Sequence, residues 1–161
     1  MTNETDPVPP VIPPPENDDR TRLAVRLGTE YALKSLRLLS SVLGGDMIAA
    51  IVIAEIVSAN TAHLNARQDA RYVRLDDLPP DSERRPVSAL AVAGSLGIPR
   101  ETARRCIKRL EAMGVCQRVK GGVIIPTAVL SIPQHQPLQA ANIANLRQLV
   151  SRVQALGVME S

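Results

Sequence analysis

The residues best suited to bind another molecule are the arginines and lysines of one short segment. Residues 99–120 hold seven Lys and Arg against two Glu. In a helix over residues 99–113, a 3.6-residue period puts Ala103, Cys106, Ile107, Leu110 and Met113 on a buried face. The opposite face carries Glu101, Arg104, Arg105 and Lys108, with Arg100, Thr102 and Arg109 at its flanks. A cationic helix face of this width fits the major groove of duplex DNA.

The residues before this helix predict a helix, a turn and then the basic helix itself. Ser88 is a good N-cap for an apolar helix over residues 88–95, because its hydroxyl can accept a free N–H of the first turn. Gly97 can adopt the left-handed backbone conformation that ends a helix, and Pro99 suits the start of the next one. Two helices joined by a tight turn are therefore expected.

A β hairpin is expected directly after the basic helix. Gly114 ends the helix, and residues 116–119 and 123–125 are rich in residues that favour strands. Lys120, Gly121 and Gly122 supply the turn between them. Arg118 and Lys120 then add positive charge at the hairpin.

This segment resembles the winged helix-turn-helix of bacterial transcription regulators of the GntR-like and MarR-like kind. The resemblance is carried by residues 86–91, 96–98, 101–105, 108–110 and 113–115 and by the hairpin over 118–123, about a quarter of the chain. It implies double-stranded DNA as the partner, a recognition helix from Pro99 to Met113 and a β wing.

The two kinds of DNA contact are expected from different residues. Base readout falls to Arg100, Thr102, Arg104, Arg105 and Lys108, whereas Arg109, Arg118 and Lys120 hold phosphates. Two alternatives remain open at this point. The charges could only solvate an amphipathic helix, or the winged helix could dock on another protein while the Pro-rich tail recruits a further one.

Composition favours duplex DNA over other nucleic acids. Residues 1–19 carry five acidic residues and no Lys or Arg, so the rest of the chain has 19 basic residues against 11 acidic ones. Phe and Trp are absent, and Tyr31 and Tyr72 are the only aromatic residues. Proteins that read RNA or single strands generally stack bases on aromatic side chains. Because the N-terminus lacks a signal-peptide pattern, we expect a cytoplasmic protein.

No motif for catalysis, cofactor binding or metal binding is present in the sequence. There is no Gly-rich phosphate loop, Ser/His/Asp set or metal-ligand spacing, so we expect no enzyme, no cofactor and no metal. Cys106 and Cys116 are ten positions apart and match no zinc spacing. We expect both to be packing residues, with a redox switch as the alternative.

The fold class expected is mainly α, with a helical N-terminal region, a winged helix-turn-helix domain and a small β hairpin. An acidic, Pro-rich disordered tail covers residues 1–19, and a helical core and dimerisation region covers residues 20–73. A polar linker follows at 74–85, the winged helix-turn-helix at 86–130, and a helix for packing or dimerisation at 131–161.

Two apolar patterns predict a homodimer. A helix over residues 47–64 is apolar almost all round, so protein or lipid must cover it. We reject a membrane span because the apolar run over residues 47–57 is short and contains Glu55. In the last helix Ile143, Leu146, Val150 and Val153 have heptad a and d spacing, with Leu149 and Leu156 beside them. The sequence specifies no effector ligand.

Overall fold

The fold is mainly helical with one small sheet, as the sequence predicts. The computed structural model describes residues 19–65, 72 and 77–157, so the expected tail lies almost wholly outside the described residues. The elements are α1 (Asp19–Ser41), α2 (Met47–Asn65), η2 (Asp81–Glu83), α3 (Ala89–Leu96), α4 (Arg100–Ala112), β1 (Gln117–Val119), β2 (Gly122–Ile124), α5 (Thr127–Leu130), η3 (Pro133–His135) and α6 (Gln136–Ala155).

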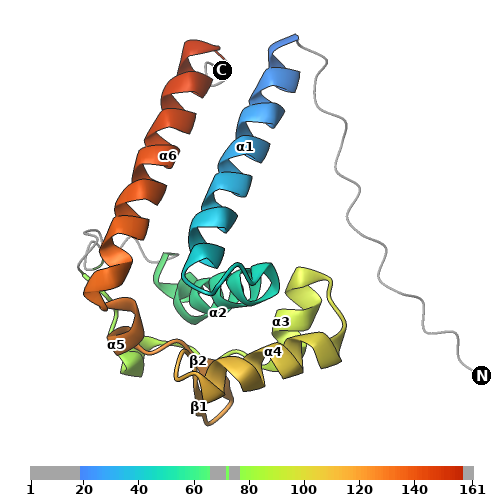
Figure 1. Cartoon of the computed structure of the whole chain (residues 1–161), viewed down its shortest axis with the longest axis vertical. Helices are drawn as coiled ribbons and strands as arrows, with labels where there is room; N and C mark the ends of the chain where they lie inside the picture. The colour runs from blue at the N-terminus through green and yellow to red at the C-terminus, as the bar shows by residue number, and fades with distance from the viewer. Residues whose placement is uncertain (1–18, 66–71, 73–76, 158–161) are drawn as a thin grey trace, which may run out of the picture.

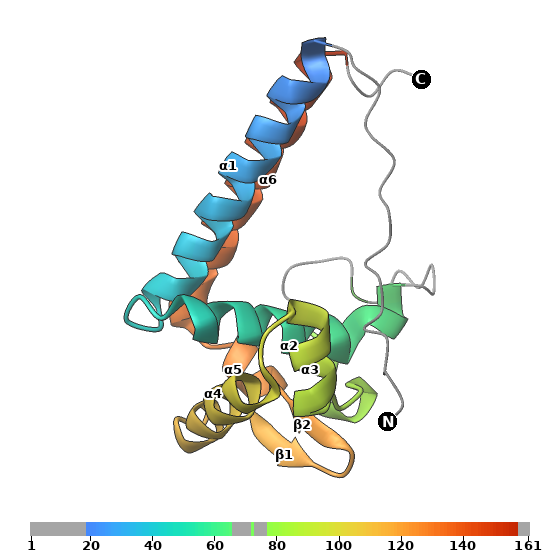
Figure 2. The ribbon, with the colours of Figure 1, turned by 90° about the vertical axis from the view of Figure 1, so that its right-hand side faces the viewer.

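Two parts are visible in the ribbon. The long helices α1 and α6 run antiparallel to each other and form what we call the arm (Figure 1). The elements α2, α3, α4, β1, β2 and α5 form what we call the body. The arm rises from one side of α2, whereas α4 and the β hairpin lie on the other side (Figure 2).

The helix α2 belongs to the core of the body. Its residues Ala49, Val52, Ile53 and Ile56 are buried in one apolar cluster with residues of α3, α4 and β2. The sequence analysis assigned α2 to the helical region over residues 20–73, before a polar linker over 74–85, and its all-round apolar pattern predicts a central helix shared between the winged helix and a dimer partner. In the structure the core extends across that linker, because α2 packs on elements that follow it.

By length and composition alone, α2 is also apolar enough to cross a membrane. The stretch Met47–Leu64 has a mean hydropathy of 1.6, and 33% of it is buried inside the molecule. The core helix of a soluble protein has the same length and composition. Burial against α3, α4 and β2 accounts for one side of α2, whereas Met47 and Ile48 remain 39% and 44% exposed.

Local capping groups fix the helix ends that the sequence predicts. The Ser88 hydroxyl accepts the N–H of Ala91 at 3.1 Å, and Gly97 ends α3 with φ of 63°. Asp46 caps α2 by accepting the N–H of Ala49 at 2.9 Å. Helix α4 begins directly after Pro99. These caps hold α3 and α4 in a fixed turn.

The hairpin is tied to the body by a third extended segment. Val87 and Val123 exchange two backbone hydrogen bonds, of 3.1 and 2.9 Å, which adds Val87 to the edge of β2. A Cβ at Gly122 would lie 2.3 Å from the carbonyl oxygen of Val87. Only glycine allows this close approach, so Gly122 is a structural requirement of the hairpin.

Two local expectations need correction. Met113 is not on the buried face of α4, because it lies at the C-terminal end of that helix with 58% of its surface exposed. The helix expected over residues 131–161 begins only at Gln136, and the Pro-containing segment before it forms the short helices α5 and η3. Each proline there precedes or begins a helical turn rather than preventing one.

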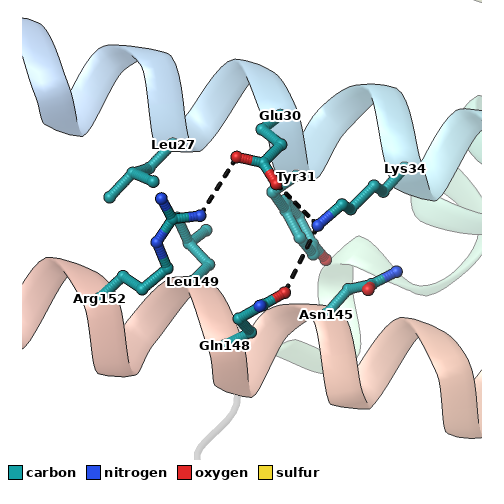
Figure 3. A pocket seen from close by; sticks show the side chains of 8 residues that line it. All are labelled: Leu27, Glu30, Tyr31, Lys34, Asn145, Gln148, Leu149 and Arg152. Carbon is teal, nitrogen blue, oxygen red and sulfur yellow. Dashed lines mark hydrogen bonds and ion pairs between the residues drawn. The ribbon is translucent and has the colours of Figure 1, made fainter.

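The two helices of the arm meet mainly through polar side chains. Glu30 of α1 bonds to Lys34 and to Arg152 of α6, at 2.7 and 3.2 Å, and Lys34 also bonds to Gln148 (Figure 3). These cations hold the pKa of Glu30 below its usual range, mainly through the hydrogen bond from Lys34. Leu27 is the one buried apolar side chain in the described part of α1, and α6 has none.

Candidate nucleic-acid interface

The exposed face of α4 carries the charges that the sequence analysis places there. Glu101, Arg104, Arg105 and Lys108 are all exposed, as is Arg100 at the start of the helix. The buried face consists of Ala103, Cys106, Ile107 and Leu110, which anchor α4 in the core. The helix therefore presents one cationic side to solvent while its other side is fixed.

Two of these arginines share one carboxylate. Arg104 makes two hydrogen bonds to Glu101, both of 2.8 Å, and Nε of Arg105 lies 3.3 Å from the same carboxylate. The hydrogen bond from Arg104 holds the pKa of Glu101 below its usual range and raises the pKa of Arg104. Glu101 thus orients Arg104, while 74% of the Arg105 side chain remains exposed.

Two further arginines, Arg109 and Arg118, are ion-paired within the molecule. Arg109 is bonded to Asp46, the residue that caps α2, so its charge is held at the start of α2. Arg118 of β1 is bonded to Glu111 of α4 at 2.8 Å, which fastens the hairpin to the helix and raises the pKa of Arg118.

Three cations at or near the exposed side of α4 are unpaired in the described part of the chain. Within residues 19–65, 72 and 77–157, the side chains of Arg100, Lys108 and Lys120 have no ion-pair or hydrogen-bond partner. Lys120 lies in the hairpin turn. Thr102, also expected to contact bases, is only partly exposed.

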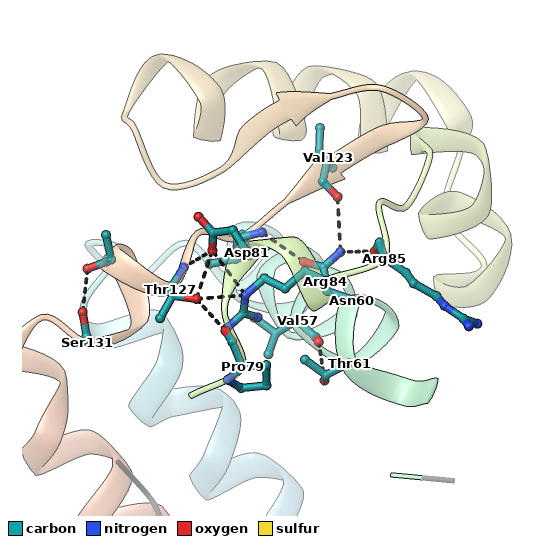
Figure 4. Close-up of polar contacts among 12 residues, drawn as sticks. Val57, Asn60, Thr61, Pro79, Asp81, Arg84, Arg85, Val123, Thr127 and Ser131 are labelled. Atoms are coloured by element: carbon teal, nitrogen blue, oxygen red, sulfur yellow. Dashed lines mark hydrogen bonds and ion pairs between the residues drawn. The ribbon is translucent and has the colours of Figure 1, made fainter. Parts of the chain in front are cut away.

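One buried residue that the sequence analysis left without a role connects α2 to the hairpin. Asn60 is fully buried, and its Nδ2 donates to the carbonyl oxygens of Arg85 and Val123, at 2.7 and 3.2 Å. Its Oδ1 accepts the N–H of Ile125 at 3.0 Å. Figure 4 shows this side chain reaching from α2 to Val123 and Arg85. Asn60 therefore sets the distance between α2 and β2.

A second polar cluster lies beside it. The Arg84 side chain is 1% exposed, and its Nη2 donates to the carbonyl oxygen of Pro79 at 3.1 Å (Figure 4). Thr127, at the start of α5, bonds to Pro79 and to Asp81. Burial lowers the pKa of Arg84. This cluster joins the segment expected to be a linker to the start of α5. The sequence analysis did not predict it.

The two cysteines are buried packing residues. Both are 5% exposed, and Sγ of Cys116 lies 3.6 Å from the carbonyl oxygen of Ile107. Burial raises the pKa of both thiols, that of Cys116 to about 11, with the charge of Glu111 adding to the effect on Cys116. At neutral pH each thiol is protonated, which is the unreactive form.

This burial predicts a specific loss of stability at high pH. The unfolded Cys116 thiol ionises near 9.0 and the folded one near 11, so stability is complete below pH 9 and falls between these values. The loss is at most about 1.4 kcal/mol per pH unit. Urea unfolding at pH 8 and pH 10 should show a steeper decline for the wild type than for Cys116→Ala. Equal declines would contradict a protonated, buried thiol.

The described part of the chain contains no candidate metal site. In the portion of the chain that the structure describes, no three His, Cys, Asp or Glu side chains cluster as a metal site would need.

Comparison with known proteins adds no relative. Comparisons with protein-family models, with curated proteins and with solved structures each found no match for this chain.

Proposed function

We propose that this protein binds double-stranded DNA in a sequence-specific manner and regulates transcription as a homodimer. In this proposal the body is a winged helix-turn-helix. Helix α3 supports α4, α4 enters the major groove and the hairpin turn contacts the adjacent backbone. The observation that carries the proposal is the exposed cationic side of α4, beside a hairpin whose turn holds the unpaired Lys120.

The energetics of the ion pairs are compatible with DNA binding. Exposed ion pairs such as those of Arg104 and Arg105 with Glu101 contribute little to stability, because water and salt screen them. A phosphate or a guanine edge can therefore replace Glu101 as the partner of either arginine at small cost. Arg109 is different, because its bond to Asp46 also orients the cap of α2. Arg118 is likewise held by Glu111, so we assign the phosphate contact first to the unpaired Lys120 and only then to Arg118 and Arg109.

The first experiment measures binding to random duplex DNA at low salt. A DNA-binding protein shows nonspecific affinity that falls steeply as salt rises, because bound Lys and Arg displace counterions from the phosphates. We expect Lys120→Ala to reduce the slope of log K against log salt by roughly one unit. Fluorescence anisotropy with a labelled duplex gives both quantities.

A matched control separates the hairpin from general charge. Arg147 is an exposed residue of α6 in the arm, so Arg147→Ala should leave the salt slope unchanged. If the wild type binds no duplex even at low salt, the DNA proposal fails and docking on a protein partner becomes the better explanation for the basic face.

The arm supports the dimer part of the proposal. Its helices bury a single apolar side chain between them, yet Val25 and Leu33 of α1 and Leu146 and Val150 of α6 are 43% to 61% exposed. Residues Asn145, Gln148, Leu149 and Arg152 face α1 (Figure 3). The seam of Ile143, Leu146, Val150 and Val153 is rotated away from that face, since each residue advances about 100° around the helix. A second arm would cover this seam.

Disrupting the seam should give monomers. Leu146→Asp is expected to shift the protein from dimer to monomer, because a carboxylate buried between apolar seams loses its hydration without a partner. Sedimentation equilibrium at micromolar concentration measures this. Ala144 is also exposed on α6 but lies off the seam, so Ala144→Asp should remain dimeric. A wild type that sediments as a monomer would end this part of the proposal.

A further inference from the structure

A cavity lies where the base of the arm meets the body. Its volume is about 340 Å³, and it is bordered by Leu39 of α1, Val42 of the α1–α2 turn, Ile53 of α2, Val129 of α5 and Leu138 of α6. Met113 and Gly114 close the side at the end of α4. Sites for small molecules typically measure roughly 300 to 1,000 Å³ and are bordered by several elements, as here.

The chemistry of the lining excludes charged ligands. The side chains around the cavity are apolar except for His135 and Gln139, and no Lys, Arg, Asp or Glu is among them. An ion placed there would lose hydration without gaining an opposite charge. A neutral, largely apolar molecule would instead exchange water contacts for contacts with Leu, Ile and Val side chains.

One polar atom at the cavity is available to orient such a molecule. Nδ1 of His135 lies 3.1 Å from the carbonyl oxygen of Val129. A carbonyl only accepts, so Nδ1 carries the proton and donates, which leaves the lone pair of Nε2 as an acceptor in the neutral ring. Among the described residues no hydrogen bond is made by Nε2. A ligand with an N–H or O–H group would complete this site.

We propose that the cavity between the arm and the body binds a neutral, largely apolar small molecule that donates one hydrogen bond to Nε2 of His135. Binding itself does not depend on the DNA proposal. Its regulatory meaning rests on the proposed function, because an occupant would contact both the base of the arm and the end of α4. It would thereby fix the angle at which a dimer presents its two α4 helices.

Isothermal titration calorimetry with indole tests the binding site. Indole is neutral, has two fused rings and carries one N–H donor, whereas 1-methylindole lacks the donor. We expect indole to bind once per chain and 1-methylindole about tenfold more weakly, the effect of losing one hydrogen bond. Indole-3-acetate, which adds a carboxylate, should bind more weakly than indole. In His135→Phe, indole and 1-methylindole should bind equally.

Two substitutions of exposed residues locate the site. Val42 is 46% exposed at the rim of the cavity, so Val42→Trp can fill the entrance without disturbing the core. Leu90 of α3 is 60% exposed and does not border the cavity, so Leu90→Trp is the matched control. We expect Val42→Trp to abolish indole binding and Leu90→Trp to retain it.

The outcomes separate the ligand site from the DNA function. Absence of indole binding to the wild type, or binding that Val42→Trp leaves intact, would overturn the site. Indole-3-acetate binding as tightly as indole would overturn the assignment to neutral ligands. If indole binds as expected and changes the duplex affinity of the wild type but not of Val42→Trp, both site and regulation are supported. Binding without any change in duplex affinity would leave the site standing and overturn its regulatory role.

Discussion

Replacing Asn60 with alanine is expected to lower the free energy of unfolding by about 3 kcal/mol, because it removes the hydrogen-bond partners of two backbone groups. The N–H of Ile125 and the carbonyl oxygen of Arg85 each bond to the Asn60 side chain. An unsatisfied buried group costs about 1 to 3 kcal/mol. The carbonyl oxygen of Val123 is less affected, because it also accepts the N–H of Val87. Urea denaturation followed by circular dichroism measures the difference.

The neighbouring residue Thr61 provides the control for this prediction. Its hydroxyl bonds only to the carbonyl oxygen of Val57, one turn earlier in the same helix. Thr61→Ala should therefore change the stability by less than about 1 kcal/mol, since alanine also favours helix formation. An Asn60→Ala protein as stable as Thr61→Ala would show that Asn60 does not hold β2 to α2.

Arg105→Ala is expected to weaken binding to a selected cognate duplex by about 1 to 3 kcal/mol, with a relaxed preference at one base pair. Arg105 is the most exposed of the paired arginines on α4, and its one contact is a 3.3 Å ion pair. Nonspecific affinity should change far less. Selection from a random duplex library supplies the cognate site, and anisotropy titrations supply the affinities.

Arg109 lies on the same helix and gives a comparison within one surface. Because it is bonded to Asp46, Arg109→Ala should affect the stability of α2 more than it affects DNA binding. Arg105→Ala must keep the melting temperature of the wild type within a few degrees, and Arg109→Ala is titrated at a temperature at which it is still fully folded, so that the affinities can be compared. If Arg105→Ala retains full affinity and base preference, α4 is not a recognition helix.

The local features of the body could be predicted from the sequence because neighbours in the chain determine them. The Ser88 cap, the left-handed Gly97 and the buried face of α4 each depend on residues within a few positions. The hairpin itself was predicted as well, but the sequence analysis placed Gly122 in the turn, whereas Gly122 begins β2 and pairs with Val119. A period of 3.6 also gave the exposed charges of α4, although it did not show that Met113 lies past the last full turn.

Contacts between segments that are far apart in the chain could not be predicted from the sequence. Asn60 and Ile125 are 65 positions apart, and Asp46 and Arg109 are 63 apart. Nothing in the sequence around Asn60 indicates which backbone groups it will satisfy, because those groups belong to extended residues of another segment. The same holds for Arg84, whose partners on Thr127 and Pro79 become neighbours only when the chain folds.

The burial of α2 beneath α3, α4 and β2 limits how this chain can be divided. A fragment that starts at residue 86 would retain the basic helix and the hairpin, yet it would expose the apolar side chains that Val52 and Ile56 cover. It would also lack the Asn60 side chain, which accepts the N–H of Ile125. A fragment of this chain that is to fold within a chimeric protein must therefore begin at or before Asp46, the residue that caps α2.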